Sequence, residues 1–192
     1  MQAGWIPVYP ASQEMETYMD YRRALSLKEI HDYIQNAQVV AFDFETSPTE
    51  KYRGEERAAL DAHKARITGI SFSVAEGSAI YVPLHHKKGR NVAKPEEVFL
   101  YLKEAFFENP NVIKVSHNLA FEAMFLYAKD IVIQEPVYDT IAAAQLTLKS
   151  KWEFRRLTDS GLKLLATSFF AADMPDFETV TGGRHFDELN PQ

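Results

Sequence analysis

The sequence contains no cysteine among its 192 residues. A disulfide framework and a thiolate metal site are therefore excluded, and the absence fits a reducing compartment, so we expect a cytoplasmic protein. No apolar run approaches the roughly 18 residues that a membrane-spanning helix needs, so no membrane partner is expected. Residues 1–10 have neither a basic region nor an apolar core of the kind found in secretory signals, so no signal peptide is expected.

A surplus of positive charge is also missing. The net charge is −6, which argues against a protein that coats duplex nucleic acid through bulk charge. An enzyme that binds only a few phosphate groups is not excluded, because acidic side chains can bind metal ions that contact the phosphates. The 46% hydrophobic and 25% charged residues are typical of a globular protein, and the length suits one domain. We find no internal repeat.

Two acidic residues end a strongly apolar stretch over 39–46. Side chains alternate along a strand, so Asp43 and Glu45 point to one face while Phe42 and Phe44 point to the other. A strand that is apolar on both faces is typical of the middle of a covered sheet. Two carboxylates there are costly unless they are neutralised, and a hard divalent cation does this most economically. The alternative is that they mark the solvated end of the strand and cap a neighbouring helix.

The other patterns predict an α/β fold, a mixed sheet with helices on both faces. Ser26 and Glu29 form a capping box that opens a helix, and the runs 67–74 and 78–84 form a β-hairpin with its turn at Gly77. Further helices are expected over 94–108, from Asn118 to about 129, and over 141–148 and 160–170, with strands at 112–115 and 131–133. Residues 1–25 are predicted to be a lead-in segment with a short helix over 12–22. Residues 26–192 are predicted to form the main domain, with an irregular tail from 171.

A third carboxylate is expected to meet the first two. Ligands bind at the carboxyl ends of strands in such sheets, where Asp43 and Glu45 are placed. Asn118 and Glu122 follow another strand, four residues apart and therefore on one helical face. Three converging carboxylates would bind a hard cation, and two ions about 3.5–4 Å apart would bridge the attacking water and the leaving oxygen of a phosphodiester. The alternative for Glu122 is an exposed position on the helix surface.

Basic and histidine residues give weaker indications. Arg155 and Arg156 lie near the predicted cleft and are expected to contact substrate phosphates. His85 and His86 follow the hairpin, but adjacent residues on an extended chain diverge. We therefore favour a plain surface loop over a metal-binding pair for these histidines.

Four segments together resemble a known family. The stretch 39–46 resembles the first motif, Asp-x-Glu, of the DEDD 3′–5′ exonuclease superfamily, and Asn118-Leu-Ala-Phe-Glu122 resembles its second, Asn-x-x-x-Asp. The hairpin resembles that of the proofreading exonuclease domain of bacterial and phage family A DNA polymerases. Val137-Tyr-Asp139-Thr140 is similar to that domain's Phe-Asp-Thr segment. The resemblance covers about residues 26–190.

The resemblance implies an RNase H-like fold and removal of 3′-terminal nucleotides from single-stranded DNA with Mg²⁺ or Mn²⁺. The implied catalytic and metal-binding residues are Asp43, Glu45 and Glu122. Asp43 would bridge both metal ions, and Glu45 would bind the ion that holds the attacking water. Thr46 and Asn118 are expected to contact the substrate. Asp139, by the same match, would support the site from its edge without binding metal.

The sequence departs from the family pattern at two points. Glu122 stands where the family usually has aspartate, which adds a methylene to a site sensitive to fractions of an ångström. The third motif, Tyr-x-x-x-Asp or His-x-x-x-Asp, is not found after Glu122. We therefore expect a chain truncated before that motif, with a polymerase domain C-terminal to it in the parent protein. The alternatives are an impaired exonuclease-like scaffold or DNA-binding module, and an RNA-trimming relative of the ribonuclease D type, against which the hairpin argues.

Overall fold

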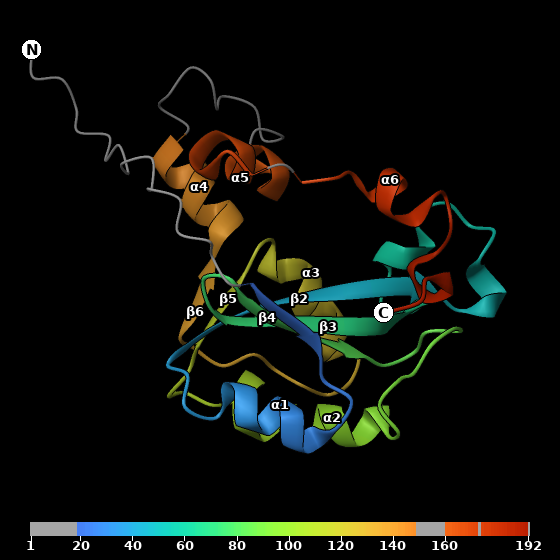
Figure 1. The fold of residues 1–192 in the computed structure, drawn as a ribbon, viewed down its shortest axis with the longest axis horizontal. Coiled ribbons are helices and arrows are strands. Elements are labelled where there is room, and N and C mark those ends of the chain that lie inside the picture. Colours follow the sequence, from blue (N-terminus) through green and yellow to red (C-terminus); the bar gives the residue numbers. More distant parts are fainter. Residues whose placement is uncertain (1–18, 149–159, 173, 192) are drawn as a thin grey trace, which may run out of the picture.

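A six-stranded mixed sheet forms the centre of the computed structural model, which describes residues 19–148, 160–172 and 174–191 (Figure 1). The strand order is β1-β4-β3-β2-β5-β6. β2 (Val39–Pro48) pairs antiparallel with β3 (Ala65–Ala75) and parallel with β5 (Ile113–Ser116). β4 (Ser78–Pro83) and β1 (Asp20–Arg23) extend the sheet beyond β3, and β6 (Val137–Asp139) extends it beyond β5. The predicted mixed sheet is confirmed.

Helices lie on both sides of this sheet, as predicted. In Figure 1, α1 (Leu27–Ile34) and α2 (Pro95–Leu102) lie below it, and α4 (Thr140–Leu148), α5 (Leu162–Phe170) and α6 (Phe177–Thr181) lie above it. α3 (Leu119–Tyr127) follows β5, and a π-helical turn over Lys103–Phe107 extends α2. Short 3₁₀ turns occupy Glu50–Tyr52, Ala58–Leu60 and Phe186–Glu188. Among the helices that the structure describes, none is long and apolar enough to cross a membrane.

The core lies against the face of β2 that carries its phenylalanines. Phe42 and Phe44 are both buried, and the Phe42 ring meets the rings of Phe106 and Phe107 edge-on, each with centroids 5.4 Å apart. Asp43 and Glu45 alternate with these residues and therefore face the other way. Because a one-residue slip would turn the carboxylates into the core, this packing fixes their register.

Local sequence signals account well for α1 and the hairpin. Ser26 Oγ accepts the N–H of Glu29 at 3.3 Å, so Ser26 is the N-cap as predicted. The Glu29 carboxylate accepts the N–H of Leu25, the residue before the cap, at 2.8 Å. β3 and β4 pair antiparallel, and Gly77 between them has a φ of 71°. This left-handed conformation is one that glycine adopts without steric cost, so the predicted turn is confirmed.

Three predictions of secondary structure are wrong. Residues 20–22, expected at the end of the helix over 12–22, belong to strand β1, whose parallel pairing with β4 runs from Asp20↔Ser78 to Arg23↔Tyr81. Residues 131–133 form no strand, because Ile131 is buried in the core and the parallel partner of β5 is instead 137–139. The tail is also not irregular throughout, since it contains α6 and the 3₁₀ turn over 186–188. Strand pairing decided the first two cases, whereas α6 begins at a local N-cap, Asp176, whose side chain accepts the N–H of Thr179.

Candidate active site

Asp43 and Glu45 lie on β2 with their side chains on the same face of the sheet. Asp43 pairs with Ser71 of β3, and Glu45 pairs with Gly69. The sequence predicted that these carboxylates end their own strand. This is wrong, because β2 continues to Pro48. The parallel pairing with β5, however, ends at Ala41↔Val115. Both carboxylates therefore extend beyond the carboxyl end of the parallel neighbour, where ligands are expected.

Glu122 lies in the first turn of α3 and is only 1% exposed. The alternative of an exposed helix-surface glutamate is therefore wrong. Its Oε2 atom and the hydroxyl of Ser116 at the end of β5 are both buried, and neither makes a well-formed hydrogen bond within the described residues, although Ser116 lies close enough to lower the pKa of Glu122. A buried carboxylate oxygen without a partner is costly, and a bound cation would remove that cost.

Electrostatic interactions link the three carboxylates. Burial, and then the charge of Asp43, raises the pKa of Glu45 to about 8. Burial raises the pKa of Glu122 to about 7, and the charges of Asp43 and Asp139 add to that rise. Burial also raises the pKa of Asp43 itself. The charge of Asp43 thus acts on both glutamates, and among the described residues no cationic side chain stabilises the ionised forms of the three groups.

The chemistry of these donors fits a hard divalent cation. All three groups offer carboxylate oxygens, which are the ligands that Mg²⁺ and Mn²⁺ prefer. Within the described residues, no three acidic or histidine side chains already surround one point. Shared coordination by Asp43, Glu45 and Glu122 therefore stays a prediction.

Asp139 has a structural role at the edge of this site. Its Oδ1 atom accepts the backbone N–H groups of Asn118 and Ile141, both at 3.0 Å, and its Oδ2 accepts that of Leu119 at 3.1 Å. One carboxylate thus caps the first turns of α3 and α4, where N–H groups lack partners within the helix. This agrees with the supporting role that the sequence predicted.

Four further residues were predicted to contact the substrate, and the structure describes two of them, Thr46 and Asn118. Asn118 precedes α3 and has a φ of 76°, which is not a helical conformation. The prediction that it shares a helical face with Glu122 is therefore wrong. The Thr46 hydroxyl donates to the Ala59 carbonyl at 2.6 Å, which commits its proton within the protein. Contacts of Thr46 and Asn118 with substrate stay predictions. Arg155 and Arg156 lie outside the described residues.

Sequence analysis missed two interactions near the carboxylates. His86 is only 7% exposed and its Nε2 lies 2.7 Å from Tyr81 Oη, so the predicted surface loop is wrong at this residue. Asp187 is fully buried and forms ion pairs with Arg53 and Arg66. These arginines are more than a hundred residues away in the sequence, a separation that no local pattern can reveal.

Comparisons with known proteins agree with this geometry. A family model described as 3′–5′ exonuclease matches residues 22–178. DNA polymerase I of Pseudomonas aeruginosa is 29% identical over 111 residues, and that of Chloroflexus aurantiacus is 26% identical over 159 residues. These alignments cover 56% and 83% of this chain but only 11% and 14% of the two polymerases. The crystal structure of Trypanosoma brucei RNase D matches 93% of this chain and 58% of its own, with a TM-score of 0.62 and 16% identity, which confirms the RNase H-like fold.

Proposed function

Because the chain belongs to the 3′–5′ exonuclease domain family, we propose that it is the proofreading domain of a DNA polymerase and removes 3′-terminal nucleotides from single-stranded DNA. One observation carries this proposal. Asp43 and Glu45 share a face of the central strand, and the buried Oε2 atom of Glu122 makes no well-formed hydrogen bond to the residues that the structure describes. The two relatives support DNA as the substrate, because both are DNA polymerases.

The three carboxylates would hold Mg²⁺ or Mn²⁺, two ions in the complete site. When bound, the metal would polarise the phosphodiester and supply an activated water. Asp43 acts electrostatically on both glutamates and is therefore placed to be the shared ligand. Asp139 fixes the start of α3 and so sets where Glu122 enters the site. Thr46, Asn118, Arg155 and Arg156 are proposed to contact the DNA strand.

A second candidate is a scaffold or DNA-binding module with impaired catalysis. The printed sequence contains no Tyr-x-x-x-Asp or His-x-x-x-Asp after Glu122, and two-metal catalysis weakens without these groups. Since the chain spans 11–14% of the polymerases it matches, we propose that its parent supplies the missing motif and then a polymerase domain.

A nuclease assay separates these functions. The chain is compared with one extended by about thirty residues of its own gene, an ordinary connection length plus a helix, on 5′-labelled DNA and RNA strands of one sequence with Mn²⁺. We expect the extended chain to shorten DNA from its 3′ end, and Asp43→Ala to slow this by about a hundredfold or more. An extended chain that is inert on both strands would support the scaffold, and a preference for RNA would support a ribonuclease.

A further inference from the structure

The ring of Tyr81 fills the space above Gly69, next to Glu45. Gly69 pairs with Glu45 across β2 and β3, and a Cβ atom on Gly69 would lie 1.9 Å from Tyr81 Oη and 2.2 Å from its Cζ. Asp43, Ser71 and Tyr81 pair in one row across the three strands, so Tyr81 is on the face of the carboxylates. An aromatic ring that covers a cross-strand glycine is a known way to fix a sheet locally.

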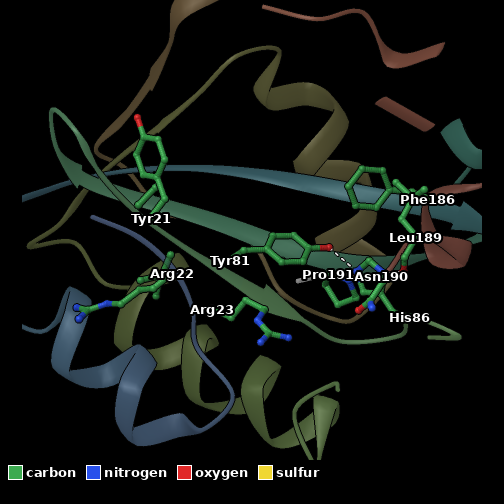
Figure 2. Close-up of a pocket in the computed structure, with 11 residues that line it drawn as sticks. Tyr21, Arg22, Arg23, Tyr81, His86, Phe186, Leu189, Asn190 and Pro191 are labelled. Carbon is green, nitrogen blue, oxygen red and sulfur yellow. Dashed lines mark hydrogen bonds between the residues drawn. The ribbon is translucent and has the colours of Figure 1, made fainter. Parts of the chain in front are cut away.

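The hydroxyl end of the Tyr81 ring is held by His86 and the C-terminal turn over 186–189. Tyr81 Oη lies 2.7 Å from His86 Nε2, and His86 Nδ1 lies 3.0 Å from the carbonyl oxygen of Leu189. Figure 2 shows Tyr81 pointing toward His86, with Phe186 and Leu189 near that end. The Phe186 ring centroid lies 5.8 Å from that of His86 and 6.5 Å from that of Tyr81. The position of Tyr81 thus depends on the turn over 186–189.

These contacts fix the direction of the phenol proton. A carbonyl only accepts, so His86 Nδ1 carries a hydrogen that it donates to Leu189. Burial lowers the pKa of His86, so at neutral pH its Nε2 is unprotonated and accepts the hydroxyl of Tyr81. The phenol proton therefore points away from Glu45. Tyr81 therefore borders Glu45 without donating its hydroxyl proton to that carboxylate.

The anchor is needed because the ring borders open space. Tyr81 and His86 line a cavity of about 430 Å³ together with Tyr21 of β1 and Phe186. A ring without the bond to His86 would have room to turn into this cavity. It would then no longer border Glu45.

We propose that Tyr81 is a positioning residue for Glu45, and that its ring, held by His86 and the turn over 186–189, sets how Glu45 presents its carboxylate to a divalent cation. The proposal rests on the proposed function, since it takes Glu45 to be a ligand. Residues that orient ligands typically change metal affinity by about 10–100-fold when they are replaced.

Calorimetric titration of the whole chain with Mn²⁺ tests this proposal. We expect Tyr81→Phe to weaken binding by about tenfold, because the ring loses its anchor. The matched control is Tyr101→Phe, since Tyr101 Oη makes a similar 2.9 Å bond to His31 Nδ1 between α1 and α2. That variant loses the same kind of hydrogen bond but should leave Mn²⁺ affinity unchanged.

Gly69 provides a second and independent variant. Gly69→Ala should displace the ring and weaken Mn²⁺ binding about as much as Tyr81→Ala does. The double variant should be no weaker than Tyr81→Ala alone, because the methyl group then has nothing to displace. If Tyr81→Phe and Gly69→Ala both bind Mn²⁺ within about twofold of the wild type, well short of the usual cost, Tyr81 does not position Glu45.

A measurement without metal separates this proposal from the proposed function. Nuclear Overhauser contacts between the Tyr81 ring and the side-chain methylenes of Glu45 are expected in the wild type and should be lost in His86→Ala. Their absence from the wild type overturns the positioning role, whatever the metal does. If they behave as expected but the wild type takes up no Mn²⁺, the nuclease function fails while the placement of Glu45 by Tyr81 stands.

Discussion

The metal-free protein is expected to become less stable as the pH rises from about 5 to about 9. Glu45 and Glu122 have pKa values of about 8 and about 7 in the folded protein, above their ordinary value of 4.5. At a pH between 4.5 and these raised pKa values, the two glutamates keep their protons in the folded protein but have released them in the unfolded chain. The stability that these groups contribute is therefore complete below about pH 4.5, falls as the pH passes through the interval, and levels off beyond pH 8.

The expected fall in the free energy of unfolding is at most about 8 kcal/mol, because the pKa values of Glu45 and Glu122 together lie about six units above 4.5 and each unit corresponds to about 1.4 kcal/mol. Urea unfolding in the presence of a chelator measures this fall. The control is the double variant with Glu45→Gln and Glu122→Gln, in which neither group titrates. Mn²⁺ at a hundred times its dissociation constant should restore about 2.7 kcal/mol to the wild type at pH 8 and nothing to this variant. Parallel pH profiles for the two proteins would contradict the account.

Asp187→Asn is expected to cost about 2–4 kcal/mol of stability, because it removes the buried carboxylate that pairs with Arg53 and Arg66 and leaves Arg53 with the more exposed carboxylates of Glu50 and Glu188. Asp187 is fully buried against Arg53, whose side chain is 17% exposed, and Arg66, whose side chain is 41% exposed. The backbone N–H of Asp187 also donates to Ser47 Oγ at the end of β2, at 2.9 Å. The lower part of this range applies if Arg66 recovers contact with water.

The matched control for this variant is Asp20→Asn. Asp20 pairs with Arg22 at 3.8 Å, with the two side chains 41% and 59% exposed, and an exposed pair of this kind is worth less than about 1 kcal/mol. Urea unfolding at pH 7 compares the two. A cost for Asp187→Asn as small as that for Asp20→Asn would mean that this charge does not hold the C-terminal turn to Arg53 and to Arg66 of β3.

The elements that could be predicted from sequence are those whose signals are local. The alternation of Phe42, Asp43, Phe44 and Glu45 is enough to place two carboxylates on one face of a central strand. The capping residues of α1 and the glycine of the hairpin likewise act on their immediate neighbours. Asp139 was assigned its supporting role only through the family resemblance, because its hydrogen bonds reach back about twenty residues to the start of α3.

The parts that could not be predicted depend on contacts between distant segments. Strand β1 is a four-residue edge strand, Asp-Tyr-Arg-Arg, that exists because β4 offers its free edge. The burial of Glu122 depends on the path of α3 over the sheet, which its sequence spacing does not encode. Tyr81 and His86 were missed because their meeting depends on Leu189, 103 residues after His86.

The central claim is that acidic groups from β2 and α3 share a divalent cation, and calorimetric titration with Mn²⁺ tests it most directly. The account predicts a saturable heat of binding for the wild-type chain and for Asp20→Asn, whose carboxylate lies on β1 away from the site. It predicts no such heat for Asp43→Ala, which loses the group that acts on both glutamates. An unchanged binding isotherm for Asp43→Ala would contradict the account.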